Sequence, residues 1–399
     1  MSEVGDYFNN IAVFSLALQT TGSGLVVSGV MLSRAIPAVA AGPVAGVLLD
    51  RFDRKRIMIA SDLIRVVVAA AFLLTIDQPR PWLLYALSAL LMFASPFFSS
   101  GRAAILPSIA TASELHTANS LTQTTQWATI TVGTLAAGYA TAWLGFRGAF
   151  LLNALSFLFS AWALAKLDAH GGSFRPRRDA HVPRGSLRPW AEYSEGLRYM
   201  RSVPLIMGIA MISVGWATGG GAAQILFALF GEQVFHRGPA GIGTLWGMAG
   251  VGLLLGGALG HVVGRRAGFA GYKRTVSWSY LSHGVTYVLF SQMENYAAAL
   301  VMILLSRVGM AASSVLNQYQ LLHHTPEDFR GRVFATLESL RWAVMIGSMA
   351  AAGIASQYFS PRTIGLVAGV LSSLTSVWWT WADWTGRLPE PSRAKGTTA

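Results

Sequence analysis

Residues 42–56, GPVAGVLLDRFDRKR, join an apolar run to a dense cluster of charge. Six of the last seven residues are charged, in a chain in which only 12% of residues are Asp, Glu, Lys or Arg. The bilayer core excludes charge, and short loops on its cytoplasmic side are enriched in Lys and Arg. The stretch therefore predicts the cytoplasmic end of a membrane span, followed by a tight loop.

The same pattern recurs along the whole chain. Hydrophobic residues make up 53% of the 399 positions, and the mean hydropathy is +0.47. Apolar runs of about 20 residues, long enough for a helix to cross a bilayer, recur without the alternation of barrel strands. The sequence predicts an all-α membrane protein with twelve transmembrane helices, of which the first is short. The predicted spans are 5–20, 24–49, 57–76, 82–108, 118–143, 146–167, 203–231, 240–264, 273–293, 295–322, 332–357 and 362–384.

Positive charge lies mainly on one side of these spans. Of the 30 lysines and arginines, 21 fall in the loops and chain ends on the side of residues 50–56, and four fall on the other side. The positive-inside rule then puts both termini in the cytoplasm, beneath a plasma (inner) membrane. The net charge of +12 belongs to this topology and gives no reason to expect a nucleic-acid partner. Cysteine is absent, so we expect neither a disulfide nor a thiolate metal site.

The chain is expected to form two pseudo-symmetric six-helix bundles. A shift of 214 residues places Gly42 on Gly256 and Gly46 on Gly260, at corresponding ends of two spans. Parallel repeats of this kind are related by an axis along the membrane normal. The expected parts are an N-terminal bundle (1–167), a cytoplasmic linker with an interfacial helix in its second half (168–202), a C-terminal bundle (203–385) and a cytoplasmic tail (386–399).

The loop after the second predicted span carries a motif that resembles the signature of the major facilitator superfamily. That signature is a glycine, three residues, Asp-Arg, one residue, a glycine and two basic residues, and here Asp53 stands where the second glycine is usual. The surrounding sequence is similar to the drug and siderophore exporter branch of the family. The motif residues are Gly46, Asp50, Arg51, Asp53, Arg54 and Lys55.

The resemblance implies a secondary active transporter that works by alternating access, as a monomer and without a cofactor. Members of the branch usually carry more residues before the equivalent of Gly5-Asp6, so we expect a truncated or misassigned start. In the family, the aspartate of the motif contacts span 11 and holds the two halves together on the cytoplasmic face. Asp50 matches that aspartate, and a helix N-terminus attracts such an anion. The charges of this loop have two alternative roles: a breakable latch between the halves, or a signal that only sets membrane topology.

Charged residues inside predicted spans are functional candidates, because charge is costly in the bilayer. Asp62 and Arg65 are three positions apart, as are Glu338 and Arg341, so each pair can form within one helix. Asp6 is expected to face a central cavity and to carry a proton, with Arg34 as a possible partner. Structural ion pairs are the alternative. The candidates for coupling are Asp6, Arg34, Arg102, Glu338 and Arg341.

Polar and aromatic residues of the predicted spans are candidates for binding a substrate. Aromatic rings stack on amphipathic ligands, although helix packing is the alternative for each residue. Three arginines inside the predicted spans, Arg34, Arg102 and Arg307, outnumber the single aspartate Asp6. This excess favours a substrate with negative charge or many oxygen atoms, such as a catecholate siderophore. The candidates are Asn9, Asn10, Gln123, Gln126, Trp127, Trp216, Gln224, Arg307, Asn317 and Tyr319.

These features favour proton-coupled export of small amphipathic molecules, either drugs or siderophore-like compounds. An importer of a small metabolite and a lysophospholipid flippase are alternatives in the same class. A membrane enzyme is disfavoured, because the sequence carries no nucleophile elbow, zinc-binding His-Glu-x-x-His or phosphate-binding loop. A non-transporting sensor is disfavoured, because no sizeable polar domain is evident.

Overall fold

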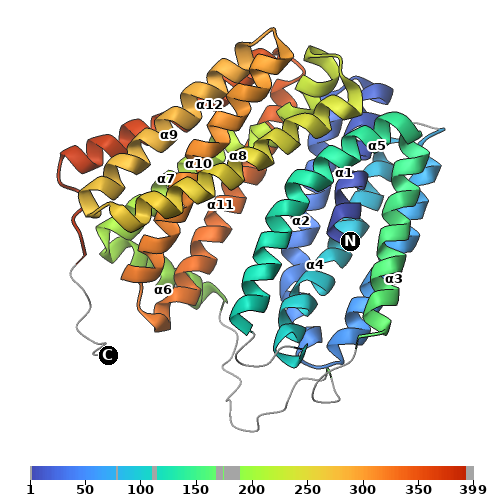
Figure 1. Ribbon diagram of the computed structural model, residues 1–399, viewed down its shortest axis with the longest axis horizontal. Helices are drawn as coiled ribbons and strands as arrows, with labels where there is room; N and C mark the ends of the chain where they lie inside the picture. Colours follow the sequence, from blue (N-terminus) through green and yellow to red (C-terminus); the bar gives the residue numbers. More distant parts are fainter. Residues whose placement is uncertain (1, 78–79, 110–114, 168–173, 175–188, 392–399) are drawn as a thin grey trace. The chain divides into compact units, whose positions relative to one another are not determined.

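The fold is helical throughout the part of the chain that the structure describes. A computed structural model describes residues 2–77, 80–109, 115–167, 174 and 189–391 (Figure 1). Within these ranges the regular elements are helices, and no β-strand is present. The prediction of an all-α protein is confirmed.

The described helices correspond one by one to the predicted elements. Helix α5 contains two spans, which meet at Gly145, whose φ of 68° lies in the left-handed region that favours glycine. The first helix has 20 residues and the second has 26. The helices are α1 (Ser2–Thr21), α2 (Gly24–Leu49), α3 (Arg54–Ala71), η1 (Phe72–Thr75), α4 (Pro81–Ile109), α5 (Leu115–Ala165), α6 (Pro189–Ser202), α7 (Pro204–Leu229), η2 (Phe230–Val234), α8 (Gly238–Arg266), α9 (Phe269–Gln292), α10 (Tyr296–His324), α11 (Glu327–Ala355) and α12 (Pro361–Trp384).

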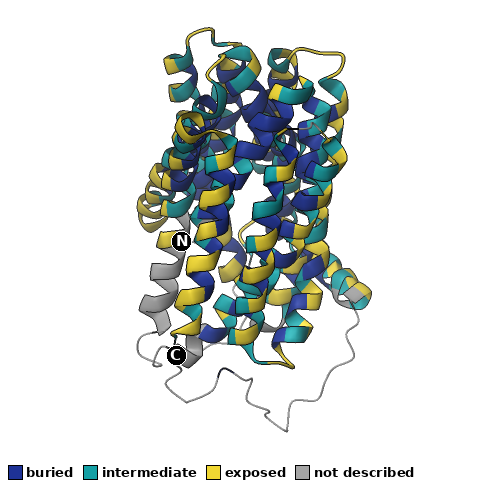
Figure 2. Cartoon of the chain, turned by 90° about the vertical axis from the view of Figure 1, so that its right-hand side faces the viewer, coloured by how far each residue is buried: buried dark blue, intermediate teal, exposed yellow. Residues whose placement is uncertain are grey.

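Twelve spans fit the described helices. Eight stretches are long and apolar enough to cross a membrane, and one of these, Ala128–Ala165, contains both spans of α5. Helices α1, α9 and α11 are long enough but more polar, and they complete the set. Exposed residues run along the length of the helices (Figure 2), and they include large apolar side chains such as Val67, Leu155 and Leu374. Lipid-facing helices require this distribution.

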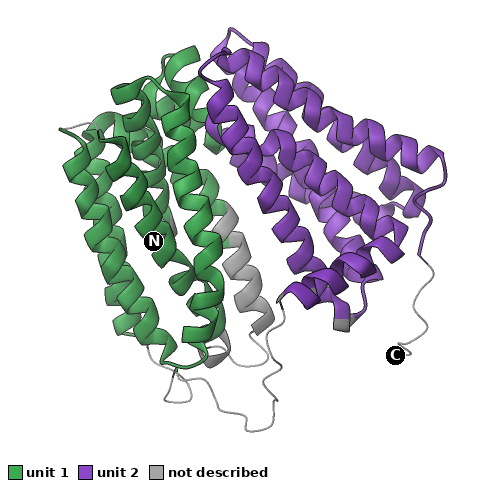
Figure 3. Ribbon diagram, turned by 180° about the vertical axis from the view of Figure 1, so that it is seen from behind, with its two compact units in different colours: residues 1–182, 227–247 green, residues 183–226, 248–399 purple. Residues whose placement is uncertain are grey.

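The structure divides into two compact units (Figure 3). Unit 1 comprises residues 1–182 and 227–247, and unit 2 comprises residues 183–226 and 248–399. In unit 1, α1 packs on α5, α2 packs on α4, and α3 packs on both α4 and α5. In unit 2, α9 packs between α10 and α12. Residues 227–247, which follow the predicted linker in sequence, lie in unit 1.

The second half of the predicted linker contains a helix, α6, which packs on α11 within unit 2. Glu195 of α6 forms an ion pair with Arg332 of α11 at 3.0 Å. Tyr199 stacks on Phe329 with ring centroids 4.9 Å apart, and its hydroxyl donates to the carbonyl of His324. The helix is therefore fixed by aromatic and ionic contacts to the start of α11.

The corner between α7 and α8 is attached to α1 by side-chain hydrogen bonds within unit 1. The π-helix η2 begins this corner, and π-helical turns commonly occur at functional sites. The Glu232 carboxylate accepts hydrogen bonds from Ser15 and, at 3.2 Å, from Gln19. Gln233 donates to the carbonyl of Gly22 at 2.9 Å. Residues 227–247 thus bind the last turns of the first helix.

Glycine also permits close backbone contact between α5 and this corner. A Cβ atom added at Gly243 would lie 2.6 Å from the Cα atom of Gly138 and 2.6 Å from the carbonyl oxygen of Thr134. These are backbone atoms, which cannot move aside as a flexible side chain can. Any larger residue at Gly243 must push the two helices apart.

We predict that Gly243→Ala lowers the thermal stability of the detergent-purified protein, by about 1–3 kcal/mol, because it overpacks the contact with α5. Gly257→Ala is the matched control in the same helix, because nothing lies within 4 Å of a Cβ atom added there. This control should be neutral or stabilising by up to about 1 kcal/mol, since alanine favours helix. Equal melting temperatures for the two variants would contradict the prediction.

Candidate functional site

The charged loop between α2 and α3 is held in place by unit 1 itself. Asp53 is the N-cap of α3, and its carboxylate accepts a hydrogen bond from the backbone N–H of Arg56 at 3.0 Å. Arg54 donates to the carbonyl of Ala104 in α4 at 2.8 Å. Lys55 donates to the carbonyls of Ala165, at 2.9 Å, and Leu167 at the end of α5.

These contacts give the loop charges a structural role. The last carbonyls of a helix have no partner within the helix, and a cationic side chain satisfies them and favours the negative end of the helix dipole. Asp50 and Arg51 are exposed, and Asp50 ends α2 with its backbone N–H bonded to the carbonyl of Gly46. Asp53, which departs from the family signature, replaces glycine with a capping side chain.

We predict that Asp53→Ala destabilises the first turn of α3 by about 0.5–2 kcal/mol, because alanine cannot cap a helix. Asp53→Asn should keep the stability of the wild type, since its side-chain oxygen can accept the same hydrogen bond from Arg56. Thermal unfolding of the purified variants checks both expectations. The cap would be irrelevant if both variants melted like the wild type.

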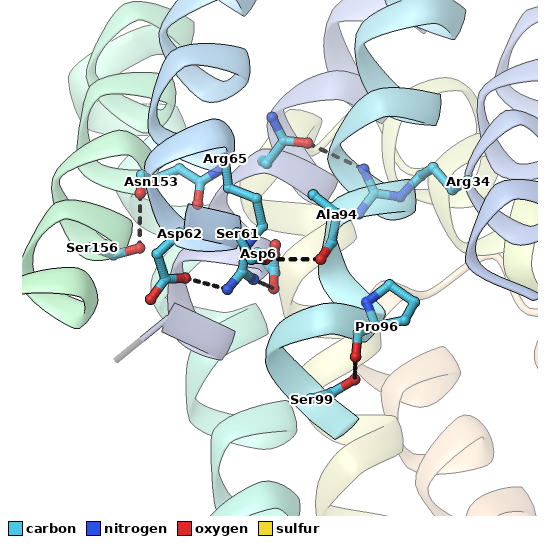
Figure 4. A network of polar contacts seen from close by, with 11 residues as sticks. Asp6, Arg34, Ser61, Asp62, Arg65, Ala94, Pro96, Ser99, Asn153 and Ser156 are labelled. Atoms are coloured by element: carbon cyan, nitrogen blue, oxygen red, sulfur yellow. Dashed lines mark hydrogen bonds and ion pairs between the residues drawn. The ribbon is translucent and has the colours of Figure 1, made fainter. Parts of the chain in front are cut away.

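A buried ionic network occupies the centre of unit 1. Arg65 of α3 forms an ion pair with Asp62, one turn earlier in the same helix, and its Nη1 atom lies 3.7 Å from Asp6 Oδ2 of α1. Arg65 therefore lies between two carboxylates (Figure 4). The side chains of Arg65 and Asp62 are 1% and 0% exposed, whereas that of Asp6 is 18% exposed. Of the two carboxylates, Asp6 is the one that water or a ligand can reach.

Two aromatic rings fix the guanidinium group of Arg65. Its Cζ atom lies 4.7 Å from the ring centroid of Phe98 in α4 and 4.4 Å from that of Phe157 in α5. Cation–π contacts strengthen when the cation is desolvated, as it is here. Four helices thus contribute to the position of one arginine, and its charge cannot move freely.

Arg34 extends the network from α2. This side chain is 8% exposed, and its Nη1 atom donates to Asn9 Oδ1 of α1 at 3.1 Å. Asp6 forms its ion pair with Arg65, and Arg34 bonds Asn9, three residues after Asp6 in α1. Arg34 still lies close enough for its charge to act on Asp6.

Several buried polar atoms of this region have no hydrogen-bond partner among the residues that the structure describes. They include both side-chain atoms of Asn153, the amide nitrogen of Asn9, the amide oxygen of Asn10 and the hydroxyl of Ser88. Buried polar groups are nearly always satisfied, by protein or by ordered water. The network therefore has room for further hydrogen bonds, from water or from a ligand.

Two of the candidates in unit 2 lie near one histidine, and the others lie elsewhere. Trp216 donates its indole N–H to His283 Nε2 at 3.1 Å, and Asn317 accepts a hydrogen bond from the hydroxyl of Tyr272 at 2.8 Å. Arg307 is 7% exposed in α10, and Gln224 is half-buried in α7. Tyr319 is 59% exposed. Trp216 and Arg307 thus share His283 as a neighbour, because the His283 ring also bonds the hydroxyl of Ser306, next to Arg307 in α10.

The remaining coupling candidates are an exposed pair and a half-buried arginine. Glu338 and Arg341 form the predicted ion pair within α11, at 2.5 Å, and both are exposed. Arg102 is half-buried in α4. The side chains of Gln123, Gln126 and Trp127 lie outside the described residues.

Sequence reasoning identified Asp6 and the Asp62–Arg65 pair but did not connect them. It also missed Glu232, Ser15 and Gln19, whose only signal is polarity inside apolar helices. Among the described residues, no three His, Cys, Asp or Glu side chains gather closely enough to hold a metal ion. The site offers paired charges and a partly exposed carboxylate, which is chemistry for holding and releasing a proton.

A twelve-span helical protein with buried charge in its spans belongs to the class of membrane transport proteins. The chain is a member of the Major Facilitator Superfamily, whose family model matches residues 2–340. It is a multi-pass membrane transporter of small molecules and not an enzyme. The predicted family is confirmed, and the relatives named as exporters or efflux pumps are consistent with the predicted branch.

Relatives along nearly the whole chain agree with this assignment. The chain is 27% identical to the uncharacterized MFS-type transporter YfiS of Bacillus subtilis, over 93% of this chain and 88% of the relative. It is 26% identical to the multidrug efflux pump Tap of Mycolicibacterium fortuitum, over 90% of this chain and 88% of the relative. A bacterial homologue of the iron transporter ferroportin, solved in an inward-facing state, has the same fold, with a TM-score of 0.69, 18% identity, and coverage of 95% of this chain and 96% of that chain.

Proposed function

We propose that this transporter exports small amphipathic molecules in exchange for protons, by alternating access. It acts as a monomer in the plasma (inner) membrane, with both termini in the cytoplasm. Export is supported by the similarity to a protein named as a multidrug efflux pump. The orientation is supported by the distribution of Lys and Arg, of which 21 lie on the side of residues 50–56.

One observation carries the coupling proposal. Asp6 is a partly exposed carboxylate in a membrane-spanning helix, and it lies 3.7 Å from the buried guanidinium of Arg65. Intramembrane carboxylates are costly, and in pumps and transporters they form proton relays. Asp6 takes a proton from the outer side in one conformation and releases it to the cytoplasm in the other.

The substrate is expected to combine an apolar body with oxygen acceptors or negative charge. Arg34 and Arg307 are buried arginines of α2 and α10, and each favours an anionic or oxygen-rich group nearby. Drugs and siderophore-like compounds have this combination of properties. A lysophospholipid has it as well, so flipping of such a lipid is the second candidate function.

Asp50 is proposed as the breakable latch on the cytoplasmic face. It is exposed at the end of α2, whereas Arg54 and Lys55 already bond the ends of α4 and α5. The latch proposal therefore concerns Asp50 and not the whole loop. An anion at this position is attracted to the positive end of a neighbouring helix N-terminus.

We predict that everted membrane vesicles accumulate a dye, a macrolide or a catecholate siderophore when their interior is made acidic. Asp6→Asn should abolish the response to the proton gradient, because an amide cannot carry the proton. Asp50→Asn should lower the rate while the gradient dependence remains. Asp77→Asn is the matched control, since Asp77 forms an exposed ion pair with Arg147 at 3.1 Å, outside the site.

Direction and substrate are tested in the same assay. Accumulation in right-side-out vesicles but not in everted ones would indicate an importer. A fluorescent lysophospholipid in the panel tests the flippase alternative. If the folded wild type moves its substrate equally well with and without the gradient, proton coupling is wrong.

A further inference from the structure

The two carboxylates that flank Arg65 are not equivalent. Asp62 is fully buried and forms the tighter ion pair, within α3, whereas Asp6 is partly exposed and lies 3.7 Å away in α1. Arg65 is clamped by Phe98 and Phe157, so it cannot follow either carboxylate out of the site. The arrangement has one fixed cation, one fixed anion and one anion that solvent can reach.

A buried arginine with a single counterion would prevent proton transfer. Protonation of that counterion would leave a desolvated positive charge without compensation, which is strongly unfavourable. Asp6 could then take a proton only at an extreme pH. Asp62 removes this obstacle, because the pair of Asp62 and Arg65 stays neutral whether or not Asp6 is charged.

We propose that Asp62 is a positioning residue for proton coupling: it holds a permanent negative charge against Arg65, so that Asp6 alone gains and loses the proton. The inference rests on the proposed function and extends it from one residue to three. The proton adds to a carboxylate oxygen of Asp6 and leaves from it, and no covalent bond other than that O–H forms or breaks.

The charged groups around Asp6 come from several elements. Arg65 and Asp62 face it from α3, and Arg34 acts on it from α2. The groups that α5 contributes nearby, at Asn153 and Ser156, are polar but carry no charge. Whether Asp6 is protonated or ionised is therefore decided mainly by two arginines and one aspartate.

The test is the pH profile of gradient-driven substrate uptake into everted vesicles. In Asp62→Asn, Arg65 keeps Asp6 as its only counterion, so the midpoint of the profile should move to lower pH by about one pH unit or more. In the double variant Asp62→Asn with Arg65→Gln, both charges are gone. The midpoint should then rise above the wild-type value, since Asp6 has lost the guanidinium 3.7 Å away that favours its ionised form.

Opposite shifts in the single and double variants are the signature of the proposed role. A merely structural pair would lower the amount of folded protein in both variants and leave the midpoints unchanged, and that result would overturn the proposal. Asp77→Asn should keep the wild-type midpoint. Size-exclusion chromatography in detergent confirms that each variant is folded. If Asp62→Asn does not fold, the double variant, which removes the Asp62–Arg65 pair as a unit, is measured instead, and an unchanged midpoint would overturn the proposal.

Failure of the inference is distinguishable from failure of the proposed function. If neither the wild type nor Asp77→Asn responds to the proton gradient, the coupling mechanism itself is wrong. If the wild type and Asp77→Asn both respond, and the Asp62 variants have the same midpoint of the pH profile as the wild type, proton coupling stands and the proposed role of Asp62 is wrong.

Discussion

A charge inside a bilayer must be compensated where it lies, and in unit 1 the buried charge that most needs compensation is that of Arg65. The guanidinium is 1% exposed, and four helices supply its surroundings: Asp6 from α1, Asp62 from α3, Phe98 from α4 and Phe157 from α5. Each of these helices must keep its register, because a slip would remove a carboxylate or an aromatic ring from a buried cation. The network therefore links the packing of unit 1 to any chemistry at Asp6.

The same unit depends on close backbone approach at its other end. Gly138 and Gly243 allow α5 and α8 to touch, and the π-helical corner brings Glu232 to Ser15 of α1. Without a hydrophobic driving force between helices in lipid, such small-residue contacts and hydrogen bonds carry much of the association energy. This explains how residues 227–247, which belong to the second half of the sequence, join the first compact unit.

Charge in the α2–α3 loop serves several purposes at once. By the positive-inside rule the basic residues favour a cytoplasmic loop, and Arg54 and Lys55 also bond the carbonyls of Ala104 in α4 and Ala165 at the end of α5. Asp53 caps α3, which accounts for an acidic residue where the family signature has glycine. Of the two aspartates in the loop, Asp50 is the exposed one, and the latch proposal rests on it alone.

The sequence by itself determined the number, length and order of the helices and the family. These follow from local properties: apolar length, the placement of Lys and Arg, and a short motif. It also determined the Asp62–Arg65 pair, because residues three apart lie on one face of a helix. Tertiary structure decided which distant residues meet: Asp6 with Arg65, Glu232 with Ser15, and Asn317 with Tyr272. Helix periodicity fixes which face a residue occupies, but only packing in three dimensions brings one helix face against another and decides how a buried charge is compensated.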